Sequence, residues 1–406
     1  MFIEQSATRL WRIRVGFVLL CLVPTIGLSG WAVRRHSVAH RQAAAAAATR
    51  LLGTEVTIAG VGHPRPGCFR LTGVRLEGMP LGQVEVESTP TEVRLRLDRC
   101  DCRPALMRLV ARLGNRWLTE PARFARNAVI EIDDLSWEKN AGDEPSARPV
   151  RLECVAAGKG RAVRIVSPTR AADEIRIVRT IESSLPQGQS RWEVDAALTE
   201  PVPVAVLIAV LEQSPLAGWR LGQGATIAGS MQSAATAGSW AGEASGRVTG
   251  ADLAAVTASL PYRADGVATL DVGSLIWADN RVTAADLTLT APRGMLAQEW
   301  LDGLISIIGC RAAPAALERT AAEPREFERL ALRLDLDGNG ARLRAEPQRA
   351  GCLVESQGLP LVFEPQAAVT LDRLAWLLSG TRAAAVPGTP VSAWLLSVLP
   401  LPQTSR

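Results

Sequence analysis

Aromatic residues and lysine are scarce in this chain of 406 residues. Aromatic residues make up only 4%, Tyr262 is the only tyrosine, and Lys139 and Lys159 are the only lysines. The other basic residues are arginines that stand beside acids, as in the run from Arg75 to Glu77, and the formal net charge is only +4. A surface that binds nucleic acid needs a concentrated basic stripe. We therefore expect no nucleic-acid partner.

The residues that carry catalysis are also few. The three histidines, His36, His40 and His63, all lie near the start of the chain, whereas a Ser-His-Asp or Cys-His enzyme needs a histidine beside its nucleophile. No Gly-x-Ser-x-Gly elbow and no phosphate-binding loop occurs. The tight acid cluster Glu131, Asp133 and Asp134 lacks the aromatic residues that line a glycosidase cleft. We expect no catalytic residue, no cofactor and no enzymatic activity.

Cysteine is present in an odd number, seven, at Cys21, Cys68, Cys100, Cys102, Cys154, Cys310 and Cys352. Cys21 lies in an apolar run, so six others could pair in an oxidising compartment. Cys100 and Cys102 lack the four-ligand spacing of a zinc site, and His36 and His40 have no third ligand nearby. We therefore expect no metal site.

The long apolar run VGFVLLCLVPTIGLSGWAV covers residues 15–33 without a charge. As a helix it would be about 28 Å long, close to the hydrocarbon thickness of a bilayer. A cleaved signal peptide is the alternative, but the run is longer than usual and Trp31, Arg34 and Arg35 stand where small residues would be expected. Arginines flank both ends, so the positive-inside rule barely decides the orientation. We expect residues 1–14 in the cytoplasm, because no second span follows.

The rest of the chain divides by its hydrophobic period. Residues 34–53 predict a membrane-proximal helix that ends at Gly53, and residues 54–200 change to the period of two that is typical of strands. An apolar helix is expected at 201–213, a second β-rich region at 214–365, and a helical, Pro-rich cap at 366–406. The predicted fold is mainly β, with a single N-terminal transmembrane helix, a long antiparallel sheet that is groove-like or sandwich-like, and a few short helices.

Two stretches show the alternation most clearly. The stretch LTGVRLEGMPLGQVEVESTPTEVRLRLD covers residues 71–98, and LALRLDLDGNGARLRAE predicts a β-hairpin. Alternation places apolar side chains on one face and charged ones on the other. The apolar face is either an open groove that shelters lipid or a core covered by other elements. The candidate groove residues are Leu76, Val84, Val86, Val93, Leu95, Leu97, Leu332, Leu334 and Leu336.

The segment from Ala47 to Gly78 resembles the start of the AsmA-like envelope proteins. In these a single span leads through a short helix to a Gly-x-x-Val-x-Ile pattern and then to a strand with a Gly-Val-x-Leu step. The matching residues here are Gly53, Val56, Ile58, Gly73, Val74 and Leu76. The stretch from Phe327 to Ala345 also looks like the paired strands near the end of that family. The typical Asp-Pro-Asn-like step after the span is missing, and the chain is shorter than the family's long members.

This resemblance implies a bacterial inner-membrane anchor, a β-groove in the periplasm, and a role in lipid handling or outer-membrane assembly. The bilayer is then one partner, and phospholipid and other envelope proteins are further partners. The alternative is an envelope scaffold with a fully packed β-body that binds other proteins and carries no lipid.

Overall fold

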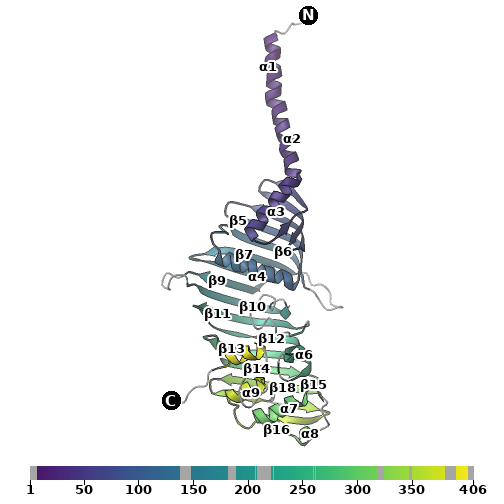
Figure 1. The fold of residues 1–406 in the computed structure, drawn as a ribbon, viewed down its shortest axis with the longest axis vertical. Coiled ribbons are helices and arrows are strands. Elements are labelled where there is room, and N and C mark those ends of the chain that lie inside the picture. The colour runs from purple at the N-terminus through teal and green to yellow at the C-terminus, as the bar shows by residue number, and fades with distance from the viewer. Residues whose placement is uncertain are drawn as a thin grey trace. The chain divides into compact units, whose positions relative to one another are not determined.

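The computed structural model describes residues 7–137, 148–181, 189–205, 207, 221–222, 224–258, 260, 262–317, 324–346, 350–379 and 390–400. It is mainly β, with one long apolar helix at the N-terminus, as the sequence predicts (Figure 1). The chain forms two compact units. Unit 1 holds residues 1–100 and 122–134, and unit 2 holds residues 101–121 and 135–406.

Unit 1 begins with the helical segments α1 (Ala7–Phe17), η1 (Val18–Leu22) and α2 (Val23–His36). Within them, Trp11–His36 is the one helix of the described residues that is long and apolar enough to cross a membrane. Its large apolar side chains face outward, with Leu20 79% exposed. A membrane anchor and a signal sequence both have this character.

A second helix, α3 (Val38–Leu52), follows after a break at Ser37. The Ser37 hydroxyl accepts a hydrogen bond from the His40 amide at 3.2 Å, which is an N-cap. Gly53 ends the helix with a φ of 66°, a left-handed conformation that glycine adopts without strain. The predicted end at Gly53 is therefore confirmed, and the helix begins later than residue 34.

The strands of unit 1 pair with antiparallel neighbours, and the last residues of β5 and β6 belong to unit 2. They are β1 (Val56–Thr57), β2 (Gly60–Arg65), β3 (Cys68–Leu76), β4 (Met79–Ser88), β5 (Glu92–Cys102) and β6 (Asn127–Trp137). Val84 faces Leu97 and Val86 faces Leu95, so the predicted alternation sets the register. Arg96, which alternates with Leu95 and Leu97, pairs with Asp133 at 2.9 Å, and Arg99 pairs with Asp134 at 3.0 Å.

Unit 2 contains the helix α4 (Pro104–Thr119) and a run of antiparallel strands that follow one another in Figure 1. The strands are β7 (Arg148–Ala157), β8 (Gly160–Ser167), β9 (Arg170–Thr180), β10 (Arg191–Pro203), β11 (Thr226–Thr236), β12 (Ser239–Asp252), β13 (Ala264–Ala278) and β14 (Arg281–Ala291). A short helix, α6 (Leu253–Thr257), packs on β13. The strands β11 and β12, which are rich in Gly, Ala and Ser, lie in the second β-rich region expected at 214–365.

After β14 the chain makes a detour before the sheet continues at β18 (Arg329–Asp337), which pairs with β14 and β19 (Gly340–Arg344). The detour and the strands that follow the hairpin fold around a core at the C-terminal end of unit 2. They include β15 (Gly294–Leu296), α7 (Gln298–Gly303), η3 (Leu304–Ile308), β16 (Arg311–Ala312), α8 (Pro314–Leu317), β17 (Arg325–Phe327), β20 (Cys352–Ser356) and β21 (Leu359–Phe363). The predicted hairpin is β18–β19.

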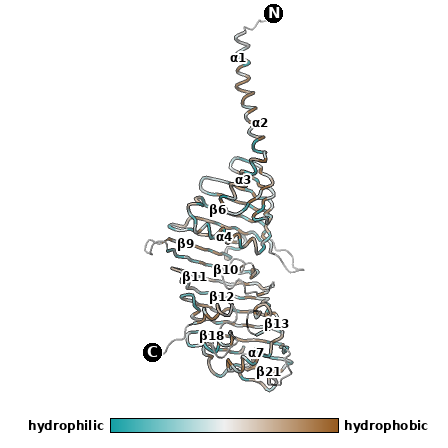
Figure 2. Tube along the Cα trace, in the orientation of Figure 1, coloured by the Kyte–Doolittle hydropathy of each residue, from teal (hydrophilic) through white to brown (hydrophobic). Residues whose placement is uncertain are grey.

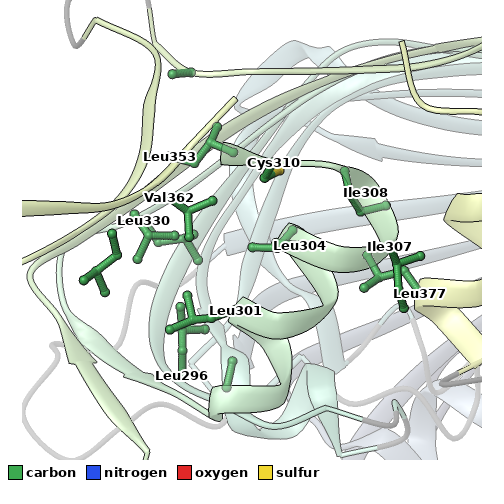
Figure 3. Close-up of a cluster of buried hydrophobic side chains, with 14 of the residues drawn as sticks. Leu296, Leu301, Leu304, Ile307, Ile308, Cys310, Leu330, Leu353, Val362 and Leu377 are labelled. Carbon is green, nitrogen blue, oxygen red and sulfur yellow. The ribbon is translucent and has the colours of Figure 1, made fainter. Parts of the chain in front are cut away.

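Figure 3 shows how this C-terminal core is filled. Leu301 and Leu304 on the α7–η3 helix point toward Leu330 and Val362 on the strands. Two last helices, α9 (Leu371–Ser379) and α10 (Pro390–Val398), pack on β19 and β14 respectively. These two helices lie within the cap expected at 366–406, whose residues 380–389 and 401–406 are outside the described residues.

The helix expected at 201–213 differs from the structure at its start. Residues 201–203 are the end of β10, where Pro203 still pairs with Thr226. The next described residues, Val204, Ala205 and Leu207, are helical. Pro203 tolerates this strand-end position because it lies where the ladder finishes. The remainder of that expected helix lies outside the described residues.

Candidate functional site

A row of apolar side chains crosses unit 2 from strand to strand. In this central row each residue directly faces the next across neighbouring strands, and each of ten consecutively paired strands contributes one residue. Its members are Leu152 on β7, Ile165 on β8, Ile175 on β9, Ala196 on β10, Met231 on β11, Ala244 on β12, Leu275 on β13, Ala285 on β14, Leu336 on β18 and Ala341 on β19. Side chains that face one another share one side of the sheet. The row is therefore one apolar surface.

Parallel rows widen this surface. On one flank lie Cys154, Val163, Ile177 and Val194, which also face one another. On the other flank Val272 faces Leu287, which faces Leu334, which faces Leu343. Brown and teal residues mingle along these strands in Figure 2, as a sheet with one apolar face requires.

Burial changes along the central row. The seven members on β7 to β13 are half-buried, whereas Ala285, Leu336 and Ala341 are buried, with Ala341 only 1% exposed. The change coincides with the C-terminal core, into which Ala285, Leu336 and Ala341 pack. The apolar surface is thus closed at its β14–β19 end and is partly accessible over β7 to β13.

The helix α4 covers the beginning of the same sheet by packing on β8 and β9. Arg161 on β8 donates hydrogen bonds to the Trp117 carbonyl at 3.2 Å and the Pro121 carbonyl at 3.1 Å, and Arg179 on β9 donates to the Leu118 carbonyl at 3.1 Å. The Arg161 guanidinium also lies 4.5 Å from the Trp117 ring centre. Cations at the carboxyl end of a helix complement its dipole. Burial lowers the pKa of Arg161, because the charged guanidinium loses contact with water at this position.

The opposite face of the sheet is charged. Arg164 pairs with Glu174 at 2.6 Å, and Arg333 pairs with Asp286 at 2.8 Å. The hydrogen bond from Arg164 lowers the pKa of Glu174, so this carboxylate stays ionised. Exposed pairs of this kind contribute little stability, but they mark the face that meets water.

Two surface hollows of about 240 and 430 Å³ lie over β10 to β13. Their linings include Gln232 and Glu243, which belong to the charged face because they alternate with Met231 and Ala244. The second hollow is therefore assigned to the charged face, whereas the lining of the first also includes Met231 and Ala244 of the central row.

The candidate groove residues fall into three groups. Leu76, Val84 and Leu97 are buried in unit 1, and Val86, Val93 and Leu95 are half-buried there. In unit 2, Leu336 is a buried member of the central row, while Leu332 and Leu334 are half-buried and pack against the C-terminal core. All nine lie on strands, and the three from β18 contact the packed end of the apolar surface.

The sequence alone did not indicate α4 or the β7–β13 part of the central row. A signal for α4 was present: Leu106, Leu109, Leu113 and Trp117 recur at helical spacing after Pro104. On β11 and β12 most residues are Ala, Gly, Ser or Thr, and the alternation is weak because these residues differ little in hydrophobicity.

Among the cysteines, Cys21, Cys68, Cys154 and Cys310 carry free thiols. Burial raises the pKa of Cys154 and of Cys310 to about 12, so both thiols stay protonated and unreactive at neutral pH. The described residues also contain no group of three or more metal-ligating side chains. The pairing that the cysteine count allowed is therefore not observed for these four thiols.

Three features are thus the basis for proposing a function: the apolar surface, the charged face on the other side of the sheet, and the N-terminal helix. Comparisons with protein-family models, with curated protein sequences and with solved structures gave no match to this chain.

Proposed function

We propose that this protein is a single-pass envelope protein of the bacterial inner membrane that shelters lipid acyl chains on the central row of its periplasmic body. The main supporting observation is the central row, in which ten consecutively paired strands each contribute one apolar residue that faces the next. Over β7 to β13 these side chains are half-buried, so a ligand could remove further apolar area from water.

The dimensions and energy of this surface suit an acyl chain. Strands lie about 4.8 Å apart, so the six spacings from β7 to β13 span about 29 Å. This is close to the hydrocarbon thickness of a whole bilayer, about 30 Å, which holds two acyl chains end to end. Each buried methylene contributes about 0.8 kcal/mol. One extended acyl chain therefore fits along the half-buried part of the central row.

The N-terminal helix and the family resemblance support the location. Trp11–His36 has the length and apolarity of an anchor, and residues 47–78 resemble the start of AsmA-like envelope proteins, for which an inner-membrane anchor and lipid handling are implied. An apolar surface of about 29 Å is too short to join two membranes. We therefore propose that the protein passes lipid to a partner protein in envelope assembly.

A second function is favoured by the packed end of the sheet. Leu332, Leu334 and Leu336 contact a core that α7, η3 and α9 fill, so this part of the apolar face is already covered. If the same held for the whole face, the protein would be an envelope scaffold that binds other proteins and carries no lipid. The half-buried members on β7 to β13 are the reason to prefer the lipid proposal.

The test is lipid capture by the full chain, purified in mild detergent and analysed by mass spectrometry. The change Ala244→Asp places a carboxylate in the central row, and Ser245→Asp places one on the exposed charged side of the same strand, β12. We expect co-purified phospholipid in the native protein and in Ser245→Asp, and a loss of about tenfold in Ala244→Asp, because a charge on an apolar surface must be desolvated by the bound chain.

Circular dichroism and thermal unfolding of both variants separate lost binding from lost folding. A folded native protein that carries no lipid would support the scaffold. Equal lipid loss from the two variants would contradict the assignment of the central row.

A further inference from the structure

Two histidines tie the membrane-proximal helix to the first strands of unit 1. His40, in the first turn of α3, and His63, on β2, approach each other with their Nε2 atoms 3.3 Å apart. Their ring centres are 5.4 Å apart, and the edge of His63 also meets the Phe69 ring on β3 at 5.1 Å. Both histidine side chains are half-buried. The pair therefore joins α3 to the β2–β3 hairpin.

This contact restricts the protonation of the pair. An Nε2 to Nε2 hydrogen bond needs one ring to donate its N–H and the other to accept with a lone pair. The accepting ring must be neutral. If both rings were protonated, neither could accept, and two positive charges would lie a few ångströms apart. The geometry is thus compatible with at most one positive charge on the pair.

The charges around the pair disfavour a second proton. Burial is the main cause that lowers the pKa of His63, and the positive charges of Arg35, His40 and His36 lower it further. Arg35 and His36 come from α2 and His40 from α3, while β3 presents the uncharged Phe69. Nearby, Arg41 donates a hydrogen bond to the Ala59 carbonyl at 2.6 Å, and Arg65 on β2 pairs with Glu87 at 3.0 Å. The charged groups that lower the pKa of His63 are thus positive, and the nearby carboxylate of Glu87 is paired with Arg65.

We propose that His40 and His63 form a pH-sensitive latch, which holds α3 and the end of the membrane helix against β2 at neutral pH and releases them in acid. The latch is independent of lipid binding. Its contribution to stability is complete above the ordinary histidine pKa of about 6.5 and is lost as the pH falls through the lowered pKa of His63. Acid therefore weakens the contact of α3 and the end of the membrane helix with the strand β2 inside unit 1.

The test is hydrogen exchange of the full chain in detergent micelles at about pH 7.5 and about pH 5, corrected for the intrinsic effect of pH on exchange. We expect protection of β2 and of the first turn of α3 to fall about tenfold at the lower pH in the native protein. In His63→Gln the amide can still hydrogen-bond to His40 but does not titrate, so protection should not change with pH by more than about twofold. The control His36→Gln removes a histidine outside the pair and should keep the loss at low pH.

Protection that is equal at both pH values in the native protein, or that falls as much in His63→Gln, would overturn the latch. If His63→Gln is unprotected at both pH values, the imidazole signals decide. The chain has only three histidines, so ¹⁵N-histidine labelling resolves each ring. We expect the His63 ring to titrate below the ordinary histidine range, because burial and the neighbouring positive charges lower its pKa; a His63 ring that titrates near about 6.5 would contradict the proposal.

Discussion

Two glycines, Gly229 on β11 and Gly246 on β12, face each other where the two strand backbones approach closely. A Cβ atom at Gly229 would overlap the carbonyl oxygen of Ser245, and one at Gly246 would overlap that of Ala228. Both residues lie on the apolar side, in the flank that continues through Val272 to Leu334. The absence of side chains here is a packing requirement of the sheet and not a sign of a flexible tract.

This close approach predicts opposite effects for two glycine-to-alanine changes. Gly229→Ala should destabilise the protein by roughly 1–3 kcal/mol, because the backbone of β12 must move to admit a methyl group. Gly114→Ala in α4 should stabilise it by up to about 1 kcal/mol, because no neighbour lies within 4 Å and alanine favours a helix. Chemical unfolding of the full chain, followed by tryptophan fluorescence, measures both. Effects of the same sign would contradict the assigned environments.

Single residues also show where reading the sequence succeeds. Val84, Leu95 and Leu97 alternate with Arg94 and Arg96, and this strong contrast fixes which face is apolar. Ala228, Ser230 and Ala244 show almost no such contrast in hydrophobicity. The sequence therefore predicted a β-rich region at 214–365 but did not indicate the row that crosses it. The row depends on register between strands, which the sequence of one strand does not contain.

Among the elements, α4 is held by arginines that come from two neighbouring strands. Arg161 and Arg179 face each other on β8 and β9, and both donate to carbonyl groups at the end of α4. Hydrogen bonds to charged groups contribute more than neutral ones. These contacts fix α4 on the apolar side of the sheet beside the central row.

We therefore expect Arg161→Gln to destabilise the protein by about 1–3 kcal/mol and to increase hydrogen exchange in the last turn of α4. The matched control is Arg176→Gln on β9, whose exposed pair with Asp195 at 3.7 Å is worth at most about 1 kcal/mol. Thermal unfolding gives the stability, and exchange locates the change. An unaltered α4 in Arg161→Gln would show that the arginine contacts do not position the helix.

The elements also show why part of the fold escaped prediction. The β18–β19 hairpin was predicted because its strands and turn are adjacent in sequence, and the Asp337 carboxylate accepts a hydrogen bond from the Asn339 amide at 2.8 Å. The pairing of β14 with β18 spans the whole detour through α7 and η3, so no local pattern specifies it. Whether Leu332 and Leu334 face a core or a groove depends on those distant helices.

For the whole molecule, the N-terminal helix is the feature that bears on the cellular location of the protein. Trp11–His36 has the features shared by anchors and signal sequences. We expect the native protein to remain in the membrane fraction after alkaline carbonate extraction, with an intact mass that includes residues 15–33, because the apolar run is longer than a usual signal peptide core. A soluble protein that lacks this segment would show that the helix is a cleaved signal.

The central row is tested most directly by photo-crosslinking in cells, with benzoylphenylalanine at Met231 and, as the control, at Gln232. These neighbours on β11 point to opposite faces, Met231 in the central row and Gln232 on the charged face. If the row shelters acyl chains, illumination should attach phospholipid at position 231 and little or none at position 232. Lipid attached equally at both positions, or only protein attached at position 231, would contradict the account.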